Sequence, residues 1–387
     1  MAFTKIKLAL TAAAVVAGGA AAADTIKVGV VAPFSGPFAR WGEQLQQAVD
    51  VYQAEHGTTV NGDEVEFVWR DSGGPNPDQA KALAQELVVK DQVSYLAGFV
   101  FTPNALAAAP IAERGQVPTV IFNAATSIIN AQSDYFVRTS FTLPQVTVPV
   151  ANYALEQGYS KIITTVTDYG PGHDAEGTFI KSFTEGGGEI VESIRMPIQT
   201  TDFAPFIQRV KDSGADAVFI FLPAGPPTFA YTKAYNENGL REAGIAFLGS
   251  GETDETSLDA LGDEALGLVT GYHYSAAHDS DVNRAFLAKL EELHPGAIAN
   301  LASVGAYDGA HVIYQMIEAG GDGLAKVEAV KGLAWESPRG PVSIDPRTRH
   351  ITQNVYMRRV AKDADGKLIN EEFETIADQP DWGFPAE

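Results

Sequence analysis

Residues 25–42 read TIKVGVVAPFSGPFARWG, an apolar run that leads directly into a loop of small residues. The run at 26–31 is rich in β-branched residues, as expected of a strand buried on both faces of a parallel sheet. The loop holds Ser35, Gly36 and Pro37, and Trp41 follows it. Ligands of parallel α/β sheets bind beyond the carboxyl ends of the strands. This stretch therefore predicts a fold class and one edge of a binding site.

The residues before this strand have the pattern of an export signal. Lys5 and Lys7 precede an apolar run at 8–16, and three alanines occupy 21–23. These features are the charged region, apolar region and cleavage site of a secretory signal peptide, which we place at residues 1–23. No later stretch approaches the ~20 apolar residues that a membrane-spanning helix needs.

Composition excludes several classes of protein. The 387 residues include no cysteine, which rules out a lipid-anchored lipoprotein and a disulfide framework. The formal net charge is −22, and it becomes about −24 without the two lysines of the signal. Such acidity aids solubility and repels phosphate backbones, so we expect no nucleic-acid partner. The length suggests two domains.

Strand and helix patterns alternate along the chain, which predicts parallel sheets with helices on both faces. Helical patterns lie between the strand candidates, and a further helix is expected at 303–319. A final strand is expected at 352–360. The earlier strand candidates are residues 26–31, 65–69, 93–97, 119–122, 161–167, 217–222, 245–248 and 268–274.

This order occurs twice, first up to about residue 140 and again up to about 270. We therefore predict two doubly wound α/β lobes joined by a hinge. The N-terminal lobe takes residues 24–142 and about 273–340. The C-terminal lobe takes 143–272 and about 341–387, with the last part of the chain crossing back between the lobes.

The loops that follow the strands carry candidate ligand-binding residues. Thr102 and Thr126 stand where a hydroxyl and a helix-start N–H group can together hold a carboxylate, and plain N-capping explains either residue alone equally well. Trp41, Phe101 and Tyr169 can wall an apolar or aromatic ligand, and core or inter-lobe packing is the alternative.

Two carboxylates follow the strand candidate at 245–248. Glu252 and Asp254 can each accept a hydrogen bond from an ammonium or a hydroxyl group. Asp254 fits better as the cap of a helix at 256–261. The sequence leaves open which of the two carboxylates faces a ligand.

The sequence offers no catalytic, metal or cofactor motif of adequate specificity. Residues 170–177 contain glycines at the wrong spacing for a dinucleotide loop, and they lack the lysine of a phosphate loop. His173 beside Asp174 supports a rival interpretation, an exported hydrolase, but no Ser or Cys nucleophile stands in an elbow motif. We therefore expect a binding protein with no metal and no cofactor.

Five short motifs occur in an order that resembles the type I periplasmic solute-binding proteins of ABC importers, specifically the branched-chain amino acid (Leu/Ile/Val-binding) family. The resemblance covers nearly the whole chain after the signal. Its motifs lie at residues 26–42, 70–80, 123–126, 136–139 and 168–170.

The resemblance implies a ligand cleft between two lobes that close around the ligand by a hinge. It implies that Thr102 and Thr126 hold the ligand's carboxylate and that the Ala124 carbonyl faces an ammonium group. Tyr169 matches an aromatic residue of the second lobe, and Trp41 lies near the mouth of the cleft.

The chain departs from the family pattern at three positions. The acidic residue that fixes the ammonium of an amino acid is expected at Gly251, whereas Glu252 stands one position later. Pro223 replaces a second-lobe tyrosine, and Phe101 is bulkier than usual. These changes favour a flat ring bearing a carboxylate over an α-amino acid.

The resemblance therefore predicts the periplasmic substrate-binding component of an ABC transporter, acting as a monomer. It would deliver an aromatic or apolar acid to the transmembrane subunits of an ABC permease. A branched-chain or hydrophobic amino acid is the alternative ligand. Alternatives from other classes are the exported hydrolase and the ligand-sensing domain of a receptor or regulator, which shares this fold.

Overall fold

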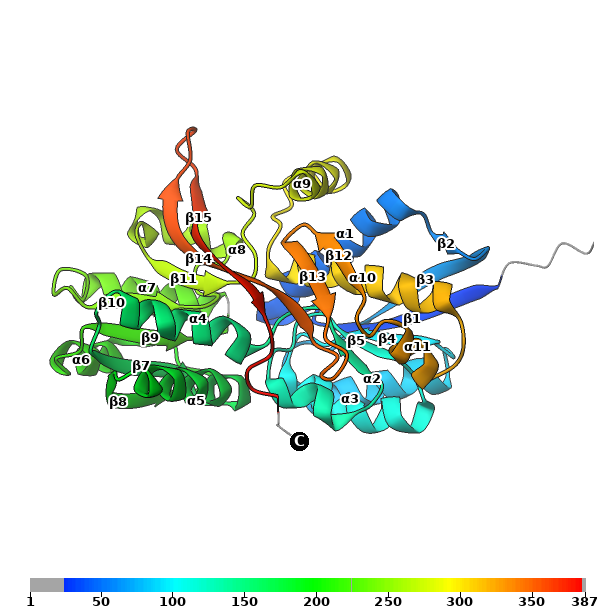
Figure 1. The fold of residues 1–387 in the computed structure, drawn as a ribbon, viewed down its shortest axis with the longest axis horizontal. Helices are drawn as coiled ribbons and strands as arrows, with labels where there is room; N and C mark the ends of the chain where they lie inside the picture. Colours follow the sequence, from blue (N-terminus) through cyan, green and yellow to red (C-terminus); the bar gives the residue numbers. More distant parts are fainter. Residues whose placement is uncertain (1–23, 224, 385–387) are drawn as a thin grey trace, which may run out of the picture.

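The computed structural model describes residues 24–223 and 225–384, which form two α/β lobes lying side by side (Figure 1). The predicted signal peptide, residues 1–23, lies outside the described residues. Each lobe is built on a mainly parallel sheet with helices on both faces, so the predicted doubly wound architecture is confirmed. No helix in the described ranges combines the length and the apolar character needed to cross a membrane.

The first sheet has the strand order β2-β3-β1-β4-β5-β6. All of its pairings are parallel except the short β2–β3 pair at one edge. The central strand β1 is fully buried from Val28 to Ala32, as its β-branched run predicts. The strands are β1 (Thr25–Ala32), β2 (Thr59–Val60), β3 (Asp63–Asp71), β4 (Tyr95–Gly98), β5 (Thr119–Ile121) and β6 (Phe136–Arg138).

The second sheet has the order β12-β13-β14-β11-β10-β9-β7-β8, and β15 pairs with β14 off this path. The pairings among β7 to β11 are parallel, whereas those that involve β12 to β15 are antiparallel. The strands are β7 (Lys161–Thr167), β8 (Glu189–Met196), β9 (Ala217–Phe221), β10 (Ala246–Gly249), β11 (Val269–Tyr272), β12 (Ala334–Ser337), β13 (Gly340–Ile344), β14 (Ile351–Lys362) and β15 (Leu368–Gln379).

Helices cover both faces of each sheet and bury its side chains. On the first sheet, α2 (Pro77–Val89) and α3 (Thr102–Gly115) cover one face. The opposite face is covered by α1 (Ala39–His56) and α10 (Leu301–Ala319). The other helices of this lobe are α9 (Asp281–Leu293) and α11 (Leu324–Ala329).

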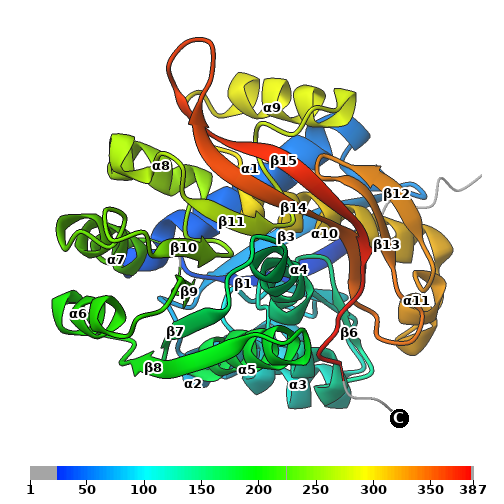
Figure 2. The same cartoon turned by 60° about the vertical axis from the view of Figure 1, so that its left-hand side comes forward.

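On the second sheet, α4 (Leu143–Glu156) and α5 (Gly170–Glu185) pack on one face. The other face carries α6 (Ala204–Asp212), α7 (Pro226–Glu237) and α8 (Glu255–Leu261), and Figure 2 shows these two groups of helices on either side of the strands. The apolar core on the α4–α5 side is continuous with that on the α1–α10 side of the first lobe. The lobes therefore share one buried core.

The chain crosses between the lobes three times. It passes from β6 to α4, from β11 to α9, and from α11 to β12. The first two crossings lie near residues 142 and 273. The third lies earlier than the predicted position near 340, because β12 and β13 already pair within the second sheet.

Two glycines let α10 approach the first sheet closely. A Cβ atom at Gly305 would lie 2.2 Å from the carbonyl oxygen of Phe122, and one at Gly309 would lie 2.1 Å from its ring. Any larger residue would push α10 away from the end of β5. This contact holds Phe122, and with it the loop at 123–126 that was predicted to bind a ligand.

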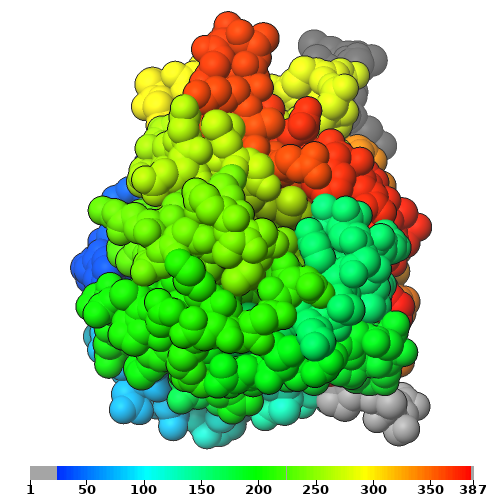
Figure 3. All heavy atoms as spheres, turned by 90° about the vertical axis from the view of Figure 1, so that its left-hand side faces the viewer, coloured from blue at the N-terminus to red at the C-terminus, as the bar shows by residue number. Residues whose placement is uncertain are grey.

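The β14–β15 hairpin projects beyond the second lobe. Figure 3 views that lobe end-on and shows the tip of the hairpin rising above the rest of the surface. The base of the hairpin is buried, with Val355, Tyr356 and Met357 almost inaccessible, whereas several acidic residues of β15 are exposed. β15 thus covers the edge of β14, which would otherwise present unpaired N–H and C=O groups.

A candidate ligand cavity between the lobes

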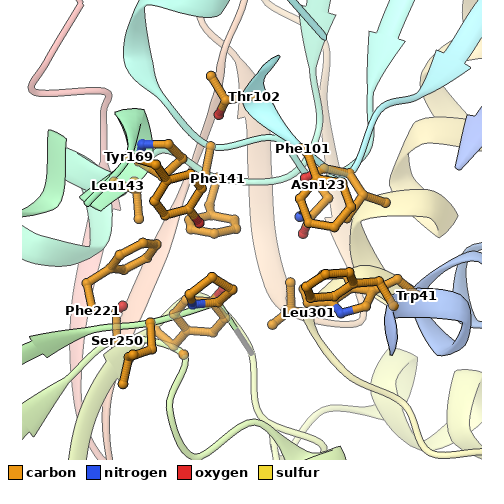
Figure 4. A pocket seen from close by; sticks show the side chains of 18 residues that line it. Trp41, Phe101, Thr102, Asn123, Phe141, Leu143, Tyr169, Phe221, Ser250 and Leu301 are labelled. Atoms are coloured by element: carbon orange, nitrogen blue, oxygen red, sulfur yellow. Dashed lines mark hydrogen bonds between the residues drawn. The ribbon is translucent and has the colours of Figure 1, made fainter. Parts of the chain in front are cut away.

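A cavity with about 640 Å³ of space between protein atoms, partly open to solvent, lies where the two lobes meet (Figure 4). Its walls come mainly from the carboxyl ends of β1, β4, β5, β6, β7, β9, β10 and β11 and from the loops that follow these strands. The first lobe contributes Phe38, Trp41, Val100, Phe101, Thr102, Asn123, Ala125 and Leu301. The second lobe contributes Tyr169, Pro171, Phe221, Leu222, Pro223, Ser250, Gly251 and Tyr272, with Phe141 and Leu143 at the crossing.

Aromatic rings from both lobes face this space. The rings of Phe38 and Phe101 meet edge-on with centroids 5.0 Å apart on the first-lobe side. On the second-lobe side the rings of Tyr169 and Phe221 lie 6.4 Å apart and nearly parallel. In Figure 4, Trp41 and Phe101 lie across the cavity from Tyr169 and Phe221. The walls are thus suited to a planar, apolar body.

The lining contains no formal charge. None of the described residues that line the cavity is Asp, Glu, Lys or Arg. Its side-chain polar groups belong to Trp41, whose indole N–H is a donor, and to Thr102, Asn123, Tyr169, Ser250 and Tyr272. An ionic group of a ligand therefore meets hydrogen-bond donors and backbone dipoles in the cavity instead of a counter-ion.

The helices α3 and α5 direct their N-termini at the cavity without a side-chain cap. Thr102 is the first residue of α3, and Tyr169 immediately precedes α5; among the described residues no side chain caps either helix. By contrast α4 and α10, which also begin at the cavity, have their first N–H groups bonded by Thr142 and Asn300. The free N–H groups and the dipoles of α3 and α5 favour an anion at this end of the cavity.

Of the seven residues predicted to bind the ligand, four line the cavity: Trp41, Phe101, Thr102 and Tyr169. Thr126 lies behind Thr102, with the two hydroxyl oxygens 2.8 Å apart. Ala124 is buried without lining the cavity, and its N–H group donates to the Phe99 carbonyl over 3.0 Å. Thr126 therefore supports the wall at Thr102, whereas Ala124 joins the loop after β5 to the residue that follows β4.

The prediction that Glu252 contacts the ligand is corrected, because its side chain lies behind the cavity wall. The side chain is 1% exposed, and its Oε1 and Oε2 atoms accept hydrogen bonds from the N–H groups of Leu222 (3.1 Å) and Ser250 (2.5 Å). Burial raises the pKa of this carboxyl to about 7. Glu252 thus orders two backbone segments that do line the cavity.

Asp254 also lies outside the cavity lining. It caps α8 by accepting from the N–H group and the hydroxyl of Thr256, as the sequence favoured. The same oxygen accepts from the Asn300 amide (3.2 Å), which also donates to Gln44. Asp254 therefore joins the second lobe to the start of α10 and to α1 in the first lobe.

The histidine proposed for a hydrolase lies outside the cavity and has a different partner. His173 Nε2 lies 2.7 Å from Asp168 Oδ1 at an exposed position, whereas Asp174 accepts a hydrogen bond from the Ser127 N–H group (3.1 Å). The His173–Asp174 pair that the rival hydrolase interpretation requires is therefore replaced by two separate contacts. Neither residue is among those that line the cavity.

Six lining residues with aromatic or polar side chains were missed from the sequence: Phe38, Asn123, Phe141, Phe221, Ser250 and Tyr272. Asn123 stood inside a quoted motif and directly follows β5, which was a usable signal. Its amide nitrogen donates to the Val100 carbonyl (2.9 Å), and its Oδ1 atom has no partner among the described residues. Phe221 is the last residue of β9, and Tyr272 is the last residue of β11. Whether such a ring faces the cavity depends on which face of the sheet its side chain lies on.

Two α/β lobes with an uncharged, aromatic-lined cavity between them define a two-lobe solute receptor. The comparisons place the chain more closely. It belongs to the periplasmic binding protein family, whose profile matches residues 25–367. The resemblance inferred from the five motifs is thereby confirmed.

Individual relatives match almost the full length. The chain is 55% identical to Leu/Ile/Val-binding protein homolog 6 of Brucella abortus (strain 2308), over 98% of this chain and 100% of that protein. A solved Rhodopseudomonas palustris ABC-transporter solute-binding protein in complex with 4-hydroxybenzoate is 54% identical, with a TM-score of 0.90, over 93% of this chain and 99% of that one.

A second solved structure is that of a solute-binding protein of an ABC transporter from Rhodopseudomonas palustris BisB5, in complex with 3,4-dihydroxybenzoic acid. It is 45% identical to this chain and has a TM-score of 0.89, covering 93% of this chain and 99% of that one. These relatives are transport proteins, and their solved complexes hold ring acids.

Proposed function

We propose that this protein captures a small aromatic carboxylate of the benzoate type as the substrate-binding component of an ABC importer. The observation that carries the proposal is the cavity lining, which joins facing aromatic rings to free helix N-termini and contains no charged side chain. Such a site suits a flat ring with a single anionic group.

The carboxylate is assigned to the end of the cavity formed by α3 and α5. There the Thr102 hydroxyl, backed by Thr126, and the N–H groups that begin the two helices can donate hydrogen bonds. Hydrogen bonds to a charged group are each worth about 1.5–3 kcal/mol, so a few of them hold a carboxylate without a cation. Because α3 and α5 belong to different lobes, an anion bound there also favours the closed arrangement.

The ring of the ligand is assigned to the space between Trp41 and Phe101 on one side and Tyr169 and Phe221 on the other. Offset or edge-on contacts between rings add about 0.5–1.5 kcal/mol beyond the burial of apolar area. This arrangement favours planar ligands over branched aliphatic ones.

A branched-chain amino acid is the second candidate, because the Brucella abortus relative bears the name of a Leu/Ile/Val-binding protein homolog. Its ammonium group would need a carboxylate within reach. The nearest candidate, Glu252, already accepts two backbone hydrogen bonds behind the wall. An ammonium would therefore be desolvated without a counter-ion, which costs several kcal/mol (order of magnitude).

The solved relatives support the same choice of ligand, since those at 54% and 45% identity hold 4-hydroxybenzoate and 3,4-dihydroxybenzoic acid. Membership of the family, together with the predicted export signal, supports a periplasmic location. The partners that we propose are the transmembrane subunits of an ABC permease, which a monomer would contact with both lobes in the closed state.

The test is a ligand screen on protein that has been unfolded and refolded to remove any bound compound. A ligand that binds only the folded state stabilises it by about 2.7 kcal/mol when present at 100 times its Kd. We expect benzoate-type acids to raise the Tm by several degrees and to give heat in calorimetry. Leucine, isoleucine and valine should leave the Tm unchanged. A Tm increase with the amino acids alone would refute the proposal in favour of the second candidate.

A further inference from the structure

Two hydroxyl groups of the second lobe line the cavity without a hydrogen-bond partner. The side chains of Ser250 and Tyr272 are 1% and 4% exposed, and within the described residues neither hydroxyl is bonded to a protein atom. Ser250 directly follows β10, and Tyr272 ends the neighbouring strand β11. Neither hydroxyl oxygen is among the fully enclosed, unpartnered polar atoms, so each is reached from the cavity, where a water molecule or a ligand can bond it.

Both residues are held firmly by their surroundings. The Ser250 N–H group donates to Glu252 (2.5 Å), and its carbonyl oxygen accepts from the buried guanidinium of Arg358 (3.4 Å). The Tyr272 ring packs edge-on against Phe141 at 5.1 Å, and the Arg358 guanidinium lies 5.1 Å from the ring centroid. The backbone of Ser250 and the ring of Tyr272 are therefore held in place beside the cavity, which positions their hydroxyl groups for a ligand.

Gly251 brings the two hydroxyls to one part of the cavity wall. A Cβ atom at this position would lie 3.3 Å from the Tyr272 hydroxyl oxygen, so that oxygen lies beside the backbone next to Ser250. In amino acid binders, the resemblance places the acid that holds the ammonium at Gly251. Because Gly251 has no side chain, the Tyr272 hydroxyl occupies this part of the cavity wall.

These hydroxyls lie opposite the end of the cavity assigned to the carboxylate. Thr102 belongs to the first lobe and Ser250 to the second, and Figure 4 shows them at opposite ends of the cavity with the rings of Tyr169 and Phe221 on the wall that joins them. A ring that places its carboxylate at Thr102 therefore directs its far side at Ser250 and Tyr272.

We propose that Ser250 and Tyr272 form a subsite for a ring hydroxyl, so that the protein selects hydroxylated benzoates over benzoate itself. This inference rests on the proposed function and adds a specificity determinant to it. Tyr272 donates a hydrogen bond, and Ser250 either donates or accepts; a phenolic hydroxyl can satisfy both. Since the two groups stay unpaired when the ligand lacks the hydroxyl, the site discriminates against that ligand.

The test compares 4-hydroxybenzoate with benzoate and 4-methylbenzoate by calorimetry. The wild-type protein should bind 4-hydroxybenzoate about ten- to a hundredfold more tightly than either analogue. Ser250→Ala and Tyr272→Phe should each weaken binding of 4-hydroxybenzoate about tenfold, and each should bind benzoate at least as tightly as the wild type, because one unpaired hydroxyl is removed. Matched controls are Ser257→Ala and Tyr95→Phe, which remove buried, unpartnered hydroxyls outside the cavity. They should change neither Kd.

Several results would overturn the subsite. Equal wild-type affinity for 4-hydroxybenzoate and 4-methylbenzoate would do so without any variant, and it would leave the proposed function intact. Equal losses for all three acids in the variants would mean a structural role for Ser250 and Tyr272. If Asn123→Ala abolished the preference for 4-hydroxybenzoate and neither second-lobe variant did, the ring hydroxyl of the ligand would be assigned to the first lobe. Failure of the wild type to bind any of these acids would refute the proposed function as well.

Discussion

The Ser127 N–H group of the first lobe donates a hydrogen bond to Asp174 Oδ2 of the second lobe over 3.1 Å. Ser127 follows Thr126, whose hydroxyl meets that of Thr102 at the cavity wall, and Asp174 lies in the second turn of α5. The bond therefore joins the two lobes beside the proposed carboxylate site. It exists only while the lobes hold this arrangement.

We expect Asp174→Ala to weaken ligand binding without touching the ligand. Loss of one such hydrogen bond disfavours the closed arrangement by about 1 kcal/mol, which corresponds to an affinity about fivefold lower. Calorimetry with 4-hydroxybenzoate measures the change. Asp168→Ala is the control, because Asp168 is exposed and pairs with His173 within the same lobe. The same Kd in both variants would show that the bond does not contribute to closure.

Buried carboxyl groups should make the stability of the protein depend on pH. Burial raises the pKa of Glu252 and Glu255 to about 7 and that of Asp174 to about 6. Between the unfolded and folded pKa values the folded state binds more protons than the unfolded chain, so its stability falls as the pH rises. We expect these carboxyls to raise the Tm near about pH 5 relative to about pH 8, whereas His273 and His350, whose pKa burial lowers, act in the opposite direction.

Glu252→Gln separates the contribution of this residue. The amide is neutral at every pH, which should remove part of the pH dependence of the Tm. It also faces two backbone N–H donors with only one acceptor, so stability near about pH 5 should fall by about 1–3 kcal/mol. Thermal unfolding across the pH range checks both effects. An unchanged pH profile in the variant would contradict the role assigned to Glu252.

Much of the fold follows from local sequence patterns. The β-branched run at 161–167 predicts β7 with the observed bounds, and β1, β5 and β9 agree within one or two residues. β8 and β15 were missed because both are edge strands with charged residues at exposed positions, so they lack an apolar run. Their pairing depends on the strand beside them.

The candidate site was predictable only in part. Residues in loops after strands could be found, since topology brings those loops together. Which side chains face the cavity depends on how the loops fold. Glu252 was therefore predicted to face the ligand, whereas its carboxylate accepts hydrogen bonds from backbone N–H groups behind the wall. Tyr272 gave no local signal, because its place at the cavity depends on where β11 ends and on the missing side chain at Gly251.

Arg339 and Asp308 should be essential for stability. They form a fully buried ion pair between the start of β13 and α10, and Arg339 also donates to the carbonyl oxygen of Ser140 at the crossing between the lobes (2.8 Å). Arg339→Met would leave the Asp308 carboxylate buried without its cation. We expect a loss of about 3–5 kcal/mol in urea unfolding.

A second variant separates the charge of this pair from its packing. Adding Asp308→Asn to Arg339→Met removes the uncompensated charge and should restore part of the loss. A double variant as unstable as the two single variants added together would contradict the assigned coupling.

Thr102 and Thr126 provide the most direct test of the carboxylate site. Their hydroxyl oxygens lie 2.8 Å apart, and Thr102 stands at the free N-terminus of α3. Thr102→Ala combined with Thr126→Ala removes both hydroxyls while leaving the helix and its neighbours in place. We expect no measurable binding of benzoate or 4-hydroxybenzoate by calorimetry.

The same double variant should lose only about 1 kcal/mol of stability, because it breaks one hydrogen bond within the protein. Thermal unfolding in the absence of ligand measures this, and a single cooperative transition would show that the fold persists. Thr147→Ala, a buried threonine of α4 whose hydroxyl has no partner in the described part of the chain, serves as the control. An unchanged affinity for the aromatic acids in the double variant would move the carboxylate away from α3 and toward the start of α5.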